Sequence, residues 1–117
     1  MQRDELYLAD IVEAADAITR FLGDAKEQVF AGNDLLRSAV LQKLIVIGEA
    51  AGRVSGDLRK QYAEIPWIDI IAFRNIAVHA YFSVNWPIVW TTATEEVPAL
   101  RAQVVQIIED INPGDEQ

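Results

Sequence analysis

The spacing of apolar residues predicts a chain made of helices. From Asp4 to Leu22 the apolar positions recur at intervals of three and four residues, which is the spacing of one helix face. A second long helix is predicted from Asn33, its N-cap, to Val54. Its apolar arc is wide, which fits a central helix or one that also takes part in a subunit contact. No stretch alternates in the manner of a strand.

Glycines and capping residues predict where these helices are interrupted. Gly23 ends the first helix, and Asp24 is expected to cap a short helix that runs through Phe30. Ser55 is the start of a short polar helix that extends to about Glu64. The N-terminal half of the chain therefore contains two long helices and two short ones.

Prolines organise the C-terminal part of the chain. Pro66 is expected in the first turn of a very apolar helix, and Ser83 or Asn85 is expected to cap the last one. Pro98 falls inside that last helix, which predicts a kink or break near Glu96-Val97. The pattern predicts an all-α fold, a four-helix up-and-down bundle with short connecting helices, in a single domain covering residues 1–117.

Composition narrows the classes of protein and partner. The net charge of −8, from eighteen acidic and ten basic side chains, argues against broad attraction to nucleic acid. A dimer could still gather its arginines around one cleft, because local potential governs what enters a site. There is no cysteine and only one histidine, so neither a disulfide nor a typical zinc site is expected. With no signal peptide pattern and no apolar run of about 20 residues, we expect a cytoplasmic protein without a membrane partner.

The candidate chemistry lies in the run from Arg74 to Tyr81. It contains His79, the only histidine, five residues after Arg74. An imidazole that titrates near neutrality beside a permanently charged guanidinium is suited to moving a proton next to a phosphate. On a regular helix, however, residues five apart point about 140° away from each other. Either the helix ends or loosens before His79, or two subunits contribute to one site.

This run resembles the Arg-x4-His-x-Tyr signature of the HepT-like ribonuclease toxins of the HEPN group. The resemblance extends from about Arg3 to about Ile108, and it includes the flanking segments Ile47-Gly48-Glu49-Ala50-Ala51, Ile65-Pro66-Trp67 and Val89-Trp90. It implies a HEPN-like homodimer with a composite cleft. It also implies the toxin of a HepT/MntA-type toxin–antitoxin pair, an endoribonuclease that cleaves RNA and not DNA.

The resemblance assigns a role to each residue of the signature. RNA carries its own nucleophile, the 2′-hydroxyl, so neither a metal nor a cofactor is expected. His79 would transfer protons, Arg74 would stabilise charge on the phosphate oxygens, and Asn75 would orient the substrate or the imidazole. Tyr81 would receive AMP from a partner minimal nucleotidyltransferase, an MntA-like antitoxin, and this modification would silence the toxin.

Each of these residues also has an ordinary structural explanation. A histidine at a helix end is often a cap, an arginine on an apolar helix is often an ion-pair partner, and Tyr81 could be a half-buried aromatic. Glu49 is either an exposed or capping carboxylate, or it orients Arg74 or His79 from a neighbouring helix. The alternative function is a non-catalytic helical subunit of a two-component nucleotidyltransferase, in which Arg74 and His79 would hold a nucleotide. Only the first function predicts RNA cleavage by this chain alone.

Overall fold

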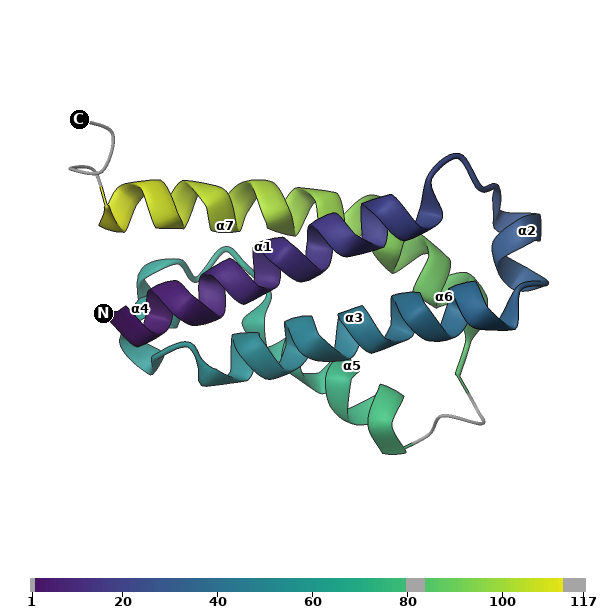
Figure 1. The fold of residues 1–117 in the computed structure, drawn as a ribbon. Helices are drawn as coiled ribbons and strands as arrows, with labels where there is room; N and C mark the ends of the chain where they lie inside the picture. The colour runs from purple at the N-terminus through teal and green to yellow at the C-terminus, as the bar shows by residue number, and fades with distance from the viewer. Residues whose placement is uncertain (1, 80–83, 113–117) are drawn as a thin grey trace.

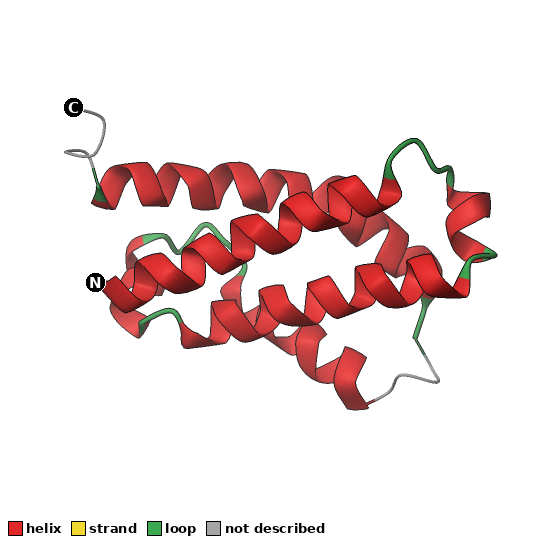
Figure 2. Cartoon of the chain, viewed as in Figure 1, coloured by secondary structure: helices red, strands yellow, loops and turns green. Residues whose placement is uncertain are grey.

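The regular structure of the chain is helical. The computed structural model describes residues 2–79 and 84–112, with side chains for all of these except 2 and 75–79. Every regular element within these ranges is a helix (Figure 2), which confirms the predicted all-α class. The elements are α1 (Gln2–Leu22), α2 (Glu27–Ala31), α3 (Asp34–Arg53), α4 (Gly56–Gln61), α5 (Trp67–His79), α6 (Trp86–Thr91), a π-helical segment (Thr92–Glu96) and α7 (Val97–Ile111).

The longer helices pack in an order that differs from their order in the chain. α1 lies between α7 and α3, and α5 packs against α3 (Figure 1). The core between α1, α3 and α7 is aliphatic and excludes water almost completely, so its burial is the main source of stability. Its most buried members include Leu8, Ile11, Ile18, Val40, Leu41, Val104 and Ile107. The central position predicted for the second long helix is therefore confirmed.

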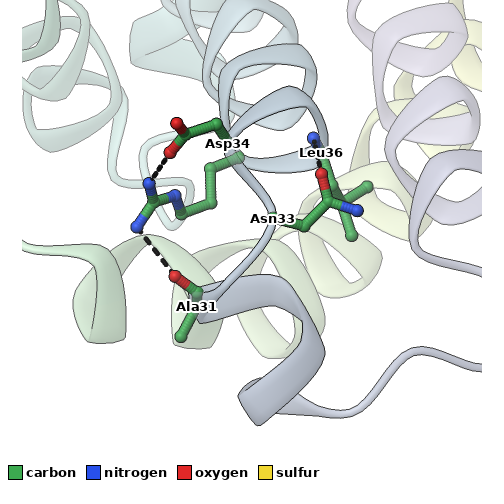
Figure 3. A network of polar contacts seen from close by, with 5 residues as sticks. Ala31, Asn33, Asp34 and Leu36 are labelled. Carbon is green, nitrogen blue, oxygen red and sulfur yellow. Dashed lines mark hydrogen bonds and ion pairs between the residues drawn. The ribbon is translucent and has the colours of Figure 1, made fainter.

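Two predicted caps, Asn33 and Asn85, are present, and Ser55, predicted as the start of a short helix, caps α4 in the same way. The Asn33 side chain accepts a hydrogen bond from the Leu36 amide at 3.0 Å (Figure 3), and Ser55 accepts one from the Leu58 amide at 3.2 Å. Asn85 caps α6 by accepting from the Ile88 amide at 3.2 Å. Ser83, the other candidate for this cap, lies outside the described residues. In each case the side chain satisfies an amide that the helix itself leaves without a partner.

Two predicted boundaries are wrong for local reasons. Asp24 does not cap α2, which starts after Lys26 with no side-chain cap. The reason is that Gly23 adopts a φ of 50° and the Ala25 amide donates to the Leu22 carbonyl, so the chain needs two more residues to complete the turn.

α4 stops at Gln61 instead of about Glu64, because the carbonyl of the next residue, Tyr62, accepts hydrogen bonds from outside the helix. The Tyr62 carbonyl accepts from the Ile65 amide at 3.1 Å and from the Trp67 indole at 3.0 Å. These two hydrogen bonds hold the chain in a non-helical turn, and α5 begins immediately after it at Trp67.

The irregularity expected near Glu96-Val97 takes the form of a π-helical segment. Thr92–Glu96 has π geometry, and Pro98 lies in the first turn of α7 immediately after it. A proline in a continuous helix lacks its amide and crowds the preceding turn. The wider π turn accommodates both effects without ending the helix.

An aromatic cluster connects α2, α3 and α6 at one end of the molecule. The Phe30 ring lies 5.4 Å from Trp90 and 6.2 Å from Trp86, measured between ring centroids. The Arg37 guanidinium lies 4.9 Å over the centroid of the Trp86 ring. It also donates to the Ala31 carbonyl at 2.8 Å and pairs with Asp34, and Figure 3 draws these two contacts as dashed lines to Ala31 and Asp34. These contacts fix the start of α6, where the chain returns after the motif.

Candidate functional site

α5 is the element that carries the motif, and its start is firmly anchored. The Trp67 side chain is only 5% exposed, and its indole donates to the Tyr62 carbonyl at 3.0 Å. Pro66 precedes the helix, and its carbonyl accepts from the Ile70 amide at 3.1 Å. The helix therefore begins as the sequence predicts, with proline at its entry.

α5 touches α3 at very short range around Arg74. A Cβ atom on Gly48 would lie 2.3 Å from the Cβ of Arg74 and 3.2 Å from the carbonyl oxygen of Ile70. Both neighbours belong to the rigid part of α5, so a side chain at position 48 would push the two helices apart. Because position 48 is glycine, the Cβ of Arg74 on α5 can pack directly against the backbone of α3.

Glu49 is the partner that meets Arg74 from α3. Arg74 Nη2 donates to Glu49 Oε1 at 3.0 Å, with 31% of the arginine side chain and 46% of the glutamate side chain exposed. Glu49 is thus an exposed carboxylate, as one interpretation had it, and it also contacts Arg74 from the neighbouring helix; that it orients the guanidinium stays a prediction. The expectation that an arginine on this helix pairs with a carboxylate also holds.

The other residues of the signature are less completely described. α5 keeps α-helical geometry through His79, which is its last residue. The idea that the helix ends or loosens before His79 is therefore wrong, and about 140° of helical rotation separates the Cα positions of residues 74 and 79. The side chains of Asn75 and His79 are not described, and Tyr81 lies outside the described residues. Assembly of one site from two subunits stays a prediction.

An apolar groove runs beside α5. It has a volume of about 410 Å³ and lies between α5, α6, the π-helical segment and α7. Ile88 lines it and is 55% exposed, and Ile68 on α5 is 81% exposed. By contrast, Leu41 on α3 is only 1% exposed, so this part of the apolar arc of α3 is covered within the chain. Exposed apolar side chains occur on α5 and α6, and Leu35 at the start of α3 is also 81% exposed.

The described residues can be compared with the requirements of a metal site and of a membrane-spanning helix. Among the side chains that the structure describes, which do not include that of His79, no group of three or more histidine, cysteine or acidic residues is placed to hold a metal ion. None of the helices described here is both long and apolar enough to cross a membrane.

Comparison with known proteins identifies the family. The family model described as "Ribonuclease HepT-like" matches residues 11–107. A Methanocaldococcus jannaschii protein named "Putative RNase MJ1216" is 36% identical over 110 residues, covering 94% of this chain and 91% of the relative. A Thermococcus cleftensis protein named "Probable ribonuclease HepT" is 33% identical over 97 residues, covering 83% of this chain and 88% of the relative. No solved structure matches.

These matches place the chain among RNA-cleaving enzymes. More specifically, it belongs to the HepT-like ribonuclease family, as the signature from Arg74 to Tyr81 indicated.

Proposed function

We propose that this chain is a metal-independent endoribonuclease toxin that acts in the cytoplasm as a homodimer, with Arg74 and His79 as its catalytic residues. The observation that carries the proposal is the position of Arg74, fixed against α3 in a family of ribonucleases. The working unit is a pair of single HEPN/HepT-like domains, each covering residues 1–117 and built as a four-helix up-and-down bundle with short connecting helices.

The reaction uses the nucleophile that RNA supplies. The neutral imidazole of one His79 accepts the 2′-hydroxyl proton, and the 2′-oxygen attacks the adjacent phosphorus. The bond from phosphorus to the 5′-oxygen breaks, and the imidazolium so formed protonates this leaving oxygen. Arg74 stabilises the charge that builds on the phosphate oxygens, and Asn75 orients the substrate or the imidazole. The products are a 2′,3′-cyclic phosphate and a 5′-hydroxyl.

Two observations support the homodimer. α5 is helical through His79, so residues 74 and 79 lie about 140° apart around the helix, which favours a site built from two copies of the motif. Ile88 lines the groove next to α5 and is 55% exposed, and Ile68 on α5 is 81% exposed, so a second subunit could cover this apolar surface. A two-fold axis would apply the same surface on both sides.

The products of the reaction test the proposal directly. Purified protein incubated with single-stranded RNA should leave 2′,3′-cyclic phosphate and 5′-hydroxyl ends, which mass spectrometry of the fragments identifies. Adding a chelator should leave the rate unchanged, since no step uses a metal. Fragments with 3′-hydroxyl and 5′-phosphate ends would contradict the mechanism. A protein that binds nucleotides and never cleaves RNA would favour the non-catalytic subunit of a two-component nucleotidyltransferase.

Regulation would act through Tyr81. In this proposal a minimal nucleotidyltransferase, an MntA-like antitoxin, transfers AMP to the phenol oxygen. The adenylyl group adds bulk and negative charge where an RNA phosphate must lie, so it opposes binding by occlusion and by repulsion.

Tyr81→Phe should keep most of its cleavage activity and escape silencing by the antitoxin and ATP, because it lacks the acceptor oxygen. Intact-mass measurement should find AMP on the wild type and none on this variant. Tyr62→Phe is the matched control and should still be modified and silenced. The Tyr62 hydroxyl donates a hydrogen bond to Asp110 at 3.0 Å. Burial and this carboxylate raise the pKa of the Tyr62 phenol, which makes its oxygen a poor acceptor of AMP. AMP that persists on Tyr81→Phe would place the modification elsewhere.

A further inference from the structure

Glu49 reaches Arg74 across a helix boundary, so this ion pair depends on the tertiary fold. Glu49 belongs to α3 and Arg74 to α5, and the pair joins Nη2 to Oε1 at 3.0 Å. Both side chains are partly exposed, so the pair lies where a phosphate in solution could also reach the guanidinium.

The preceding residue fixes the other end of the same arginine. Gly48 lies under the Cβ of Arg74 so closely that its own Cβ would come within 2.3 Å. Two consecutive residues of α3 therefore position Arg74 at its root and at its tip. A long side chain that is held at both ends loses less conformational freedom on binding the transition state than an unrestrained one does.

Stability alone gives a weak reason for this pair. Exposed ion pairs contribute little to folding because water screens them. The fold contains a comparable pair, Arg101 Nε to Asp16 Oδ1 at 2.6 Å, with 45% and 42% of the side chains exposed. That pair joins α7 to α1, which do not carry the motif. It therefore provides a control for effects that are only structural.

Binding alone gives no reason for the pair either. A carboxylate beside the guanidinium offsets part of its positive charge and so weakens its attraction for a phosphate. The chain already has a net charge of −8, so another negative group at the site opposes RNA affinity. What the carboxylate can provide is a fixed direction for the guanidinium.

We propose that Glu49 is a positioning residue: it holds the guanidinium of Arg74 in the orientation that stabilises the transition state, at some cost in RNA affinity. The inference rests on the proposed function, because it gives Glu49 a role through a catalytic Arg74. The inference predicts different effects for two substitutions. Glu49→Ala removes the hydrogen-bond acceptor for Arg74, whereas Glu49→Gln keeps an acceptor oxygen and removes only the charge.

Steady-state kinetics of RNA cleavage test this separation. Glu49→Ala should lower kcat about tenfold without raising KM, since misplaced catalytic groups reduce rate strongly. Glu49→Gln should keep most of kcat with an equal or lower KM, and Asp16→Ala should match the wild type. In an Arg74→Ala background, Glu49→Ala should have no further effect, because coupled residues are not additive. An unchanged kcat in Glu49→Ala, or an equal loss in the Arg74→Ala background, overturns the inference.

A second measurement needs no RNA and separates the two proposals. Phenylglyoxal modifies accessible arginines, and peptide mapping reports each position. Arg74 should react several-fold faster in Glu49→Ala than in the wild type, whereas Asp16→Ala should accelerate only Arg101. A wild type that cleaves no RNA defeats the proposed function. Equal modification of Arg74 in wild type and Glu49→Ala shows that the pair does not form, and overturns the inference whatever the outcome for cleavage.

Discussion

Replacing His79 with alanine should reduce RNA cleavage by about 10²-fold or more, the usual contribution of a positioned acid or base. His79 is the only imidazole in the chain, so no other side chain has an ordinary pKa near neutrality. The measurement is the single-turnover rate on a defined RNA at saturating enzyme, which removes effects on binding.

His79→Asn is the matched variant for this test. It keeps a polar side chain that can donate and accept hydrogen bonds, but it cannot exchange a proton near neutral pH. It should therefore be as inactive as His79→Ala, and both variants should unfold at the temperature of the wild type. Full activity in either variant would remove His79 from proton transfer, and activity only in His79→Asn would reduce its role to orientation.

Heterodimers of Arg74→Ala and His79→Ala subunits should regain activity that both homodimers have lost. If each site takes arginine from one subunit and histidine from the other, one of the two sites in such a dimer is intact. A two-fold dimer with one intact site should show about half of the wild-type rate. Coexpression of the two variants with different affinity tags, followed by tandem purification, isolates the heterodimer for this assay.

This experiment depends on the geometry of α5. Because the helix continues through His79, a site within one subunit would have to join residues about 140° apart on the helix. The controls are the two homodimers, each carrying both tags and purified in the same way. Heterodimers as inactive as these controls would show that each site lies within one subunit, and a monomer with full activity would exclude the composite site altogether.

The helix boundaries that the sequence predicted correctly depend on local contacts. Asn33, Ser55 and Asn85 cap amides only three residues away, so the donor and the acceptor appear in one short stretch of sequence. Asp24 was misassigned because the left-handed turn at Gly23 sets the length of the connection. Local capping chemistry cannot indicate how many residues such a turn will use.

The surroundings of Arg74 could be predicted only in part. Small residues around Gly48 indicated that another helix could approach α3 closely, and the structure shows this approach at Arg74. Arg74 was one of two candidate partners for Glu49, and the sequence could not choose between them, because Arg74 lies 25 residues away and the pairing of α3 with α5 is a tertiary contact. The wide apolar arc of α3 suggested a central helix or one that also takes part in a subunit contact; the fold buries Leu41 within the chain, and the subunit contact stays a prediction.

The π-helical segment Thr92–Glu96 makes the fold sensitive to the number of residues, and not only to their identity. A π turn holds one more residue than an α turn, and each residue rotates a helix by about 100°. A single deletion there could restore a regular α-helix, and it would rotate α6 about its axis relative to α7. Trp90 would then leave Phe30, and the return from α5 would have to follow another path. Among related chains, insertions and deletions should therefore be excluded from this segment and tolerated in the turn between α1 and α2.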